Sequence, residues 1–407
     1  MTDGLGVKED VPGFPMTRTC PFAPPPEYAE LRETEPISEV RLTLNGRRAW
    51  LLTKYEDVVK VLADPRASSD VTHDGYPLFM PVPVELLKAM PRILFHMDPP
   101  EHTATRKLLT PEFTARRVDA MRPSTQEIVD LLIDDMVKQG STADLVHKLA
   151  LPLPSYAMCD LLGLPREDRE FMHSWISRLV SKEMTPEGHG MLQMEMAMHM
   201  DEILDAKEKE PGDDLISRVL ARNIENGTNL GRPEIITLIM ALVAGGHETT
   251  ANMISLGTLA LLRNPDELAQ LKANPSVCRD AVEEMMRLFS VSDFGTSRVA
   301  LEDIEIGGMT IRAGEGIIAS MGAANHDPAV FTDPGTFDID RSPNRQIGFG
   351  YGMHVCSGAS LVRMQLEIVF NTLFARLPDL RLAVPFEELE YKEASFIHGV
   401  IEMPVTW

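Results

Sequence analysis

Apolar and polar residues first alternate along the chain and then recur at helical spacing. Residues 40–44 alternate and lead into Asn45-Gly46, a strong signal for a β-hairpin. We expect the returning strand at residues 49–53 and a short helix over residues 55–62.

Helical spacing dominates from there. In the segment that opens at Pro123, the apolar residues Ile128, Leu131, Leu132 and Met136 are predicted to share one helix face.

A much longer helix is predicted over residues 233–263, where the chain is apolar nearly all round. At 1.5 Å per residue it would span about 46 Å, enough to cross the molecule. Short extended segments are expected after residue 287, at residues 298–306, 309–311 and 316–320. The last helix is expected near the end of the chain, over residues 360–377. The predicted class is mainly α with small β-sheets near both ends (α+β).

No internal repeat, low-complexity tract or Gly/Ser linker divides the sequence, so we expect a single domain over residues 1–407. The hydrophobic fraction of 44% and the charged fraction of 25% are those of an ordinary globular protein. A formal charge of −22 disfavours binding to nucleic acid or to anionic membrane surfaces.

The four cysteines, Cys20, Cys159, Cys278 and Cys356, are far apart and form no CxxC pair, which argues against a disulfide framework. The longest apolar run, residues 238–246, is about half the length that a membrane span of ~18 residues needs. We therefore expect a cytoplasmic protein without a membrane segment.

Residues 349–358 read Phe-Gly-Tyr-Gly-Met-His-Val-Cys-Ser-Gly and carry the strongest chemical signal of the chain. Glycines let backbone amides approach the sulfur of Cys356 closely. Those amides and the amino end of the following helix favour a thiolate. A buried thiolate is an electron-donating axial ligand for haem iron. The alternative is an inert buried cysteine beside a glycine-rich turn.

Phe349, Gly352, Cys356 and Gly358 are spaced as in the ligand loop of the cytochromes P-450, the haem-thiolate monooxygenases, and the chain resembles this family over nearly its whole length. It looks similar to the soluble bacterial class related to drug- and vitamin-oxidising actinomycete members. The resemblance implies heme b (iron protoporphyrin IX) as cofactor and Cys356 as its metal ligand, with Phe349 and Gly358 in the cofactor site.

The long helix carries Gly245-Gly246-His247-Glu248-Thr249, which is similar to the family's distal element. The resemblance implies that Gly245 leaves room for dioxygen, and that Glu248 and Thr249 are catalytic because they deliver protons to it. The alternatives are a threonine that bonds back to a helix carbonyl and an exposed charge at Glu248. His247 is expected to be structural.

The resemblance also implies a buried structural network of Glu284, Arg287 and Arg341 that fixes the ligand loop. For the haem propionates it implies four cationic or hydrogen-bonding partners, namely His102, Arg106, Arg298 and His354.

Electrons would come from ferredoxin and ferredoxin reductase, because the sequence shows no glycine fingerprint for flavin or nicotinamide. The ferredoxin would dock on a basic proximal face, formed by Lys107, Arg116, Arg117, Arg345 and Arg363. The alternative is scattered solubilising charge.

The substrate pocket is assigned only by family analogy, to residues 72–94, 177–200, Met240, Ala244, 291–296 and 396–397. Its methionines, Met191, Met194, Met196, Met198 and Met200, would either repack around ligands or pack an amphipathic helix. Both interpretations suit a small, mostly apolar organic substrate.

The favoured hypothesis is a monooxygenase that inserts one atom of dioxygen into such a substrate by hydroxylation or epoxidation. One alternative is an NADH-dependent nitric oxide reductase of the haem-thiolate type, because residues 271–275 and 316–320 look similar to that fungal branch. The other is a non-catalytic haem-binding protein.

Overall fold

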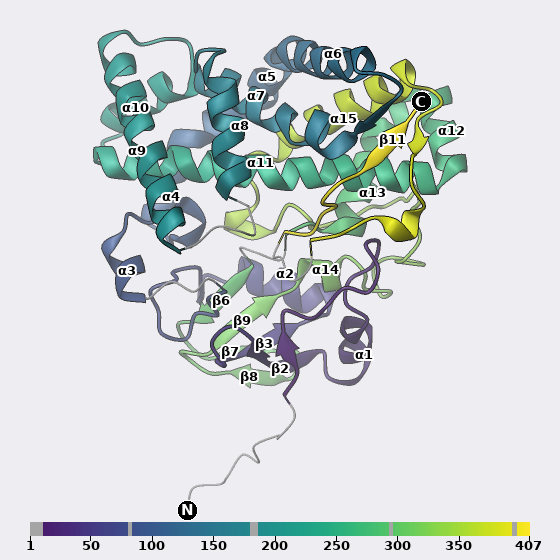
Figure 1. Ribbon diagram of the computed structural model, residues 1–407. Coiled ribbons are helices and arrows are strands. Elements are labelled where there is room, and N and C mark those ends of the chain that lie inside the picture. Colours follow the sequence, from purple (N-terminus) through teal and green to yellow (C-terminus); the bar gives the residue numbers. More distant parts are fainter. Residues whose placement is uncertain (1–10, 80–83, 180–185, 293–295, 393–396) are drawn as a thin grey trace, which may run out of the picture.

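The computed structural model describes residues 11–79, 84–179, 186–292, 296–392 and 397–407. Helices make up the larger part of the molecule, and the main sheet lies at the end from which the amino terminus emerges (Figure 1). The helices are α1 (Glu27–Thr34), α2 (Tyr55–Ala63), α3 (Val84–Ala89), α4 (Glu101–Leu109), α5 (Ala115–Ala120), α6 (Arg122–Lys138), α7 (Pro152–Leu162), α8 (Asp168–Leu179), α9 (Pro186–Lys209), α10 (Leu215–Glu225), α11 (Arg232–Arg263), α12 (Pro265–Ala273), α13 (Cys278–Phe289), α14 (Met321–Ala324) and α15 (Ala359–Arg376).

The strands form a six-stranded sheet in the order β1-β2-β3-β9-β6-β4, a three-stranded sheet β10-β11-β5 and the pair β7-β8. Their bounds are β1 (Gly13–Phe14), β2 (Ile37–Leu42), β3 (Arg48–Leu52), β4 (Ala67–Ser68), β5 (Thr142–Asp144), β6 (Ser297–Ala300), β7 (Ile304–Ile306), β8 (Met309–Ile311), β9 (Gly316–Ala319), β10 (Arg381–Leu382) and β11 (Pro404–Thr406). The predicted class, mainly α with small sheets, is confirmed.

The amino-terminal hairpin forms as predicted, with β2 and β3 antiparallel and Val40 opposite Ala49. Gly46 adopts a φ of 71° in the connection, which a residue with a Cβ rarely adopts. The strand ends at Leu42, however, and Leu44 lies in the turn with 48% of its surface exposed. The prediction that Leu44 continues the strand is therefore wrong, because the turn begins at Thr43.

Helix α6 begins near Pro123 as predicted, but its buried face is different from the predicted one. Ile128, Leu132 and Met136 are buried, whereas Leu131 is 44% exposed. The buried stripe also includes Val129 and Ile133, and Leu131 lies about 160° from each of these two residues around a helix of 3.6 residues per turn.

Helix α11 crosses the helical part of the molecule and is the element around which the others pack (Figure 1). It covers the predicted range, with Pro233 in its first turn and Arg263 in its last. Every residue from Thr250 to Leu261 is buried, which explains the apolar sequence on all sides of this segment. At Gly257 an added Cβ would lie 2.5 Å from Phe370 Cζ and 2.7 Å from Met285 Sδ, so the glycine lets α13 and α15 approach closely.

The predicted network of Glu284, Arg287 and Arg341 is present. Glu284 Oε1 accepts from Arg287 Nη2 at 2.7 Å and from Arg341 Nε at 3.1 Å. Arg287 also donates to the carbonyls of Asn325 and Thr336. The network therefore joins α13 to the segment that leads into the ligand loop.

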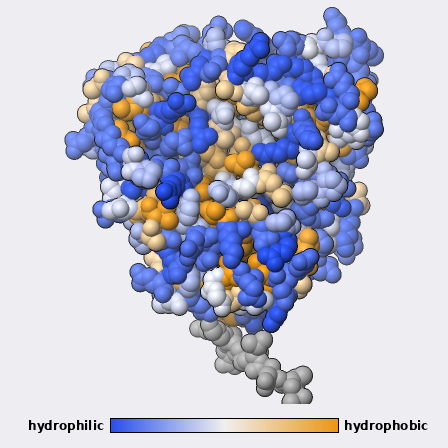
Figure 2. All heavy atoms as spheres, turned by 180° about the vertical axis from the view of Figure 1, so that it is seen from behind, coloured by the Kyte–Doolittle hydropathy of each residue, from blue (hydrophilic) through white to orange (hydrophobic). Residues whose placement is uncertain are grey.

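Within the described ranges, no helix combines the length and the apolar composition that crossing a membrane would require. The face seen in Figure 2 is mostly hydrophilic and is interrupted by small hydrophobic patches.

Candidate active site

The loop of residues 349–358 folds tightly in front of α15. The amide of Cys356 donates to the carbonyl of Phe349 at 2.8 Å, which closes the loop. Gly350 and Gly352 have positive φ values of 81° and 71°. An added Cβ on Gly352 would lie 2.5 Å from the carbonyl oxygen of Leu62, so the loop packs directly against the end of α2.

Cys356 lies deep in the molecule, yet its side chain faces open space. Burial raises the pKa of its thiol, against the opposing effects of the Gly358 and Ala359 amides and of Arg106 and Arg363. The amides at the start of α15 therefore favour the thiolate, as expected, but in the protein alone their effect is smaller than that of burial. A bound metal ion deprotonates a coordinating thiol outright.

The four predicted partners of the haem propionates gather beside this loop. The rings of His102 and His354 lie 4.3 Å apart between centroids. Burial, together with the nearby charges of Arg298, His102 and Arg106, lowers the pKa of His354 to about 2. His102 Nε2 is buried and has no hydrogen-bond partner among the described residues. Such a cluster fits an anionic group that bears carboxylates.

Arg106 has a second role that the sequence did not reveal. Its Nη1 donates to the carbonyl of Met353 at 2.8 Å and its Nη2 to that of Val355 at 2.6 Å. It therefore ties α4 to the ligand loop beside Cys356.

Four further side chains complete the surroundings of His354 and Arg298, and sequence reasoning missed them as site residues. Ser69 Oγ lies 3.0 Å from His354 Nε2, and the Ser69 amide donates to Asp98 Oδ1 at 2.9 Å. Burial raises the pKa of Tyr76 to about 12 and lowers that of His96 to about 4, and the charge of Arg298 acts on both. Asp98 belongs to the motif before His102, but Ser69, Tyr76 and His96 reach the site only through folding.

On α11, Ala244 and Gly245 are exposed although they lie in the middle of a helix packed on several sides. An added Cβ on Gly245 would meet nothing within 4 Å, so open space lies beside this turn, as the distal motif implies. His247 is buried and donates from Nε2 to the carbonyl of Leu151 at 2.9 Å, as expected of a structural histidine.

The two predicted proton-delivery residues, Glu248 and Thr249, both have hydrogen-bond partners within the protein. Thr249 Oγ1 donates to the carbonyl of Gly245 at 2.7 Å, which is the back-bonded arrangement considered as an alternative. Glu248 is buried rather than exposed, and its Oε1 accepts from Lys392 Nζ at 2.5 Å. No local sequence signal points to Lys392, which lies 144 residues further along the chain.

The predicted basic face is partly neutralised. Lys107, Arg116 and Arg345 are exposed. Arg363 pairs with Glu283, and Arg117 lies 3.9 Å from Glu112. The net positive charge of this face is therefore smaller than the sequence suggests.

The methionines of α9 divide between two faces, as helical spacing requires. Met196 and Met200 are buried in the core, whereas Met191, Met194 and Met198 are exposed. The amphipathic-packing interpretation accounts for the buried pair. Of the other pocket residues assigned by analogy, Ile397 is half-buried and bridges Ser292. Residues 80–83, 180–185 and 293–295 and Phe396 lie outside the described residues.

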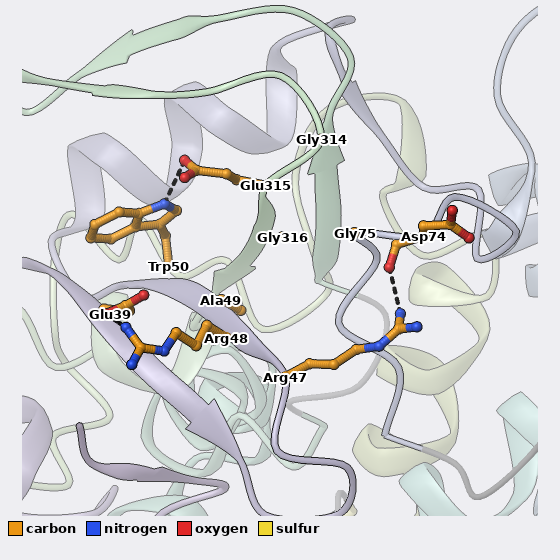
Figure 3. Close-up of a pocket in the computed structure, with 10 residues that line it drawn as sticks. All are labelled: Glu39, Arg47, Arg48, Ala49, Trp50, Asp74, Gly75, Gly314, Glu315 and Gly316. Carbon is orange, nitrogen blue, oxygen red and sulfur yellow. Dashed lines mark hydrogen bonds and ion pairs between the residues drawn. The ribbon is translucent and has the colours of Figure 1, made fainter. Parts of the chain in front are cut away.

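A cavity of about 320 Å³ lies beside β3 and β9 (Figure 3). It is lined by Glu39, Arg47, Arg48, Ala49, Trp50, Asp74, Gly75, Gly314, Glu315 and Gly316. Its polar groups pair with one another, as in the bond of 2.8 Å from Trp50 Nε1 to Glu315 Oε2. It contains neither Cys356 nor the distal turn, so it is separate from the candidate active site.

A deep cysteine that faces open space, a cationic cluster near it and a helix turn with an open glycine together fit a haem-thiolate centre. Comparisons with known proteins agree. The family model described as "Cytochrome P450" matches residues 158–378. The "Vitamin D3 dihydroxylase" of Streptomyces griseolus is 41% identical over 399 residues, which cover 98% of this chain and 97% of that protein. The "Pentalenic acid synthase" of Streptomyces avermitilis is 43% identical and covers 97% of both chains.

Among solved structures, cytochrome P450 MoxA from Nonomuraea recticatena (CYP105) matches with a TM-score of 0.92 and 47% identity, over 97% of this chain and 98% of that one. The chain belongs to the cytochrome P450 family. It is a haem b-dependent monooxygenase of the soluble bacterial type. The predicted family, enzyme class and cofactor are thereby confirmed.

Proposed function

We propose that this monooxygenase hydroxylates a mid-sized, mostly apolar molecule of secondary metabolism. The balanced reaction is RH + O₂ + 2 e⁻ + 2 H⁺ → ROH + H₂O. When bound, the haem supplies the reductive activation of dioxygen. The observation that carries the proposal is the deep side chain of Cys356, which faces open space at the amino end of α15.

The chain's own residues would divide the remaining work. Cys356 would bind the iron, with Phe349 and Gly358 shaping the loop around the sulfur. His102, Arg106, Arg298 and His354 would hold the propionates, since they already gather at one side of the loop.

On the distal side, Gly245 would leave room for dioxygen. The hydroxyl of Thr249 would turn from the carbonyl of Gly245 towards dioxygen, and the carboxyl of Glu248 would pass protons to it.

The haem-thiolate assignment is tested by Cys356→Ser. The wild-type protein, reduced under carbon monoxide, should show the long-wavelength Soret band of thiolate-ligated haem, and the variant should lose it. Cys20→Ser, which changes an exposed cysteine remote in sequence from the loop, should keep the band. Persistence of the band in Cys356→Ser would refute the assignment.

The substrate class is supported by relatives whose names refer to vitamin D3 and to pentalenic acid. We expect such apolar compounds to shift the resting Soret band to shorter wavelength when they displace water from the iron. A screen that includes vitamin D3 tests this, and shifts produced only by polar compounds would contradict the apolar assignment.

The electron donor is proposed to be ferredoxin with its reductase, supported by the exposed Lys107 in α4 and Arg116 in α5. Lys107→Glu should slow haem reduction by ferredoxin at low salt, and added salt should abolish the difference. Nitric oxide reduction and non-catalytic haem binding are not favoured, because the relative named "Vitamin D3 dihydroxylase" is by its name an oxygenating enzyme.

A further inference from the structure

The guanidinium group of Arg363, near the start of α15, lies over the ring of Phe349 in the ligand loop. Its Cζ is 4.4 Å from the centroid of that ring. It also forms a two-point ion pair with Glu283 of α13, in which Nη2 donates to Oε2 at 2.9 Å and Nε donates to Oε1. Such a fork fixes a guanidinium group more tightly than a single contact does. A side chain predicted to dock ferredoxin is thus engaged inside the protein, although 37% of it remains exposed.

The carboxylate of Glu283 is held in turn by the segment that leads into the ligand loop. Gln346 donates from Nε2 to Glu283 Oε2 at 2.8 Å, and its Oε1 accepts from the amide of Gly348 at 2.6 Å. Burial acts to raise the pKa of Glu283, but the hydrogen bonds from Arg363 and Gln346 outweigh burial and lower this pKa below its usual value. Glu283 is therefore ionised at neutral pH, and Arg363 is the positive member of a fixed ion pair.

Phe349 connects this ion pair to the cysteine of the ligand loop. Its carbonyl accepts from the amide of Cys356 at 2.8 Å, and its ring lies under the guanidinium group of Arg363. A cation is attracted to the face of an aromatic ring, because the π electrons give that face a partial negative charge. Arg363 therefore helps to fix Phe349, and Phe349 helps to fix Cys356.

The charge of Arg363 also acts on the sulfur itself. Burial raises the pKa of the Cys356 thiol, and the charges of Arg106 and Arg363 oppose this rise. The two cations differ in their partners. Arg106 donates to two carbonyls of the ligand loop, whereas Arg363 is paired with the carboxylate of Glu283. The two members of the pair Arg363–Glu283 carry opposite charges, so they act on negative charge at the sulfur with opposite signs.

Reduction of ferric to ferrous haem adds one electron to the iron and its ligand. A positive charge nearby stabilises the reduced form, and a negative charge destabilises it. We propose that Arg363 is a positioning residue of the ligand loop that raises the reduction potential of the haem, and that Glu283 opposes it. The inference rests on the proposed function, because it takes Cys356 as the iron ligand. It goes beyond that function by giving an arginine of the predicted docking face a role inside the protein.

The test measures the equilibrium between ferric and ferrous haem by titration with dithionite and redox mediators, without ferredoxin. A unit charge at about 10 Å, with an effective dielectric constant of about 20–40, changes such an equilibrium by about three- to fifteenfold. Arg363→Met should therefore shift it towards ferric haem by about this factor, or about 30–70 mV for one electron. Glu283→Gln should shift it the other way, because it removes a negative charge. The double variant should lie near the wild type, because it removes both charges.

Two further variants separate charge from packing. Arg363→Lys keeps the charge but not the planar fork, so its potential should lie closer to the wild type than that of Arg363→Met. The matched control is Arg122→Met. Arg122 pairs with Glu367 of the same helix α15 at 2.8 Å, and these side chains are 42% and 34% exposed, against 37% and 25% for Arg363 and Glu283. Since Glu367 lies outside the ligand loop, this variant should keep the wild-type potential.

A residue that only docks ferredoxin would give a different result. Arg363→Met would then slow haem reduction by ferredoxin at low salt and leave the titrated potential unchanged, which would overturn the inference. If Arg363→Met binds no haem, Glu283→Gln decides, because an unchanged or lowered potential in that variant also overturns the inference. The proposed function is judged separately by the carbon monoxide spectrum. It fails if Cys356→Ser keeps the thiolate band, and it stands, whatever the potentials are, if the band is lost.

Discussion

Replacing Glu284 by glutamine should destabilise the protein far more than removing any single hydrogen bond. The carboxylate is fully buried and accepts from Arg287, Arg341 and Asn344, and from the amide of Asp338. Glutamine has the same shape, but it carries no charge and turns an amide donor towards groups that are themselves donors.

The magnitude follows from burial. Arg287 is fully buried and the side chain of Arg341 is 8% exposed, so neither cation can recover hydration when its counter-charge is removed. Breaking a buried ion pair in this way costs about 3–5 kcal/mol. With an unfolding entropy of about 2.1 cal/mol/K per residue, the apparent Tm of this 407-residue chain should fall by about 4–6 °C.

The assay measures the apparent Tm of Glu284→Gln and of Asp135→Asn by circular dichroism. Both variants are measured as haem-saturated ferric protein and at the same scan rate. Asp135 pairs with Lys138 at the same i,i+3 spacing and at 3.2 Å, but both side chains are more than half exposed. Such a surface pair contributes about 0–1 kcal/mol, which corresponds to a Tm change of about 1 °C or less. Equal Tm values for the two variants would refute the reasoning, because they would show that burial does not set the cost.

The remaining predictions concern close packing and pH. Gly257→Ala should lower the apparent Tm by about 1–4 °C, because the added Cβ would clash with Phe370. Gly245→Ala should not lower the Tm, because an added Cβ has open space there, but it should weaken carbon monoxide binding to the reduced haem. A fall in Tm for Gly245→Ala would contradict this prediction. Burial lowers the pKa of His326 to about 3, so the unfolded chain binds a proton below pH ~6.5 that the folded chain does not. Stability is therefore fully present above that pH and is lost on acidification, by about 2 kcal/mol at pH 5 for this histidine. His326→Gln should make the Tm depend less on pH between pH 7 and 5, whereas His73→Gln, at an exposed histidine, should leave this dependence unchanged. If His73→Gln reduces the pH dependence more than His326→Gln does, the role given to His326 is wrong.

Local sequence was sufficient to predict those parts of the site whose residues are neighbours along the chain. The ligand loop places Phe349, Cys356 and Gly358 within ten residues, and the fold keeps them together in front of α15. The long apolar helix was also predictable, because burial on all sides leaves no charged residue between Thr250 and Leu261. The buried face of α6 was not predictable in full, because the helices that pack on α6 decide which of its apolar residues are covered. Leu131 lies outside the covered face.

The sequence by itself determined the class of the protein, the cysteine that would bind iron and the turn of helix that would face dioxygen, because each depends on residues a few positions apart. Only the tertiary structure decided which groups surround them: Ser69 beside His354, Arg106 on the ligand loop, and Lys392 on Glu248. It also decided that burial raises the pKa of the Cys356 thiol. These contacts join segments as much as 285 residues apart, and both ion-pair strength and desolvation depend on distances and burial that arise only when the chain has packed.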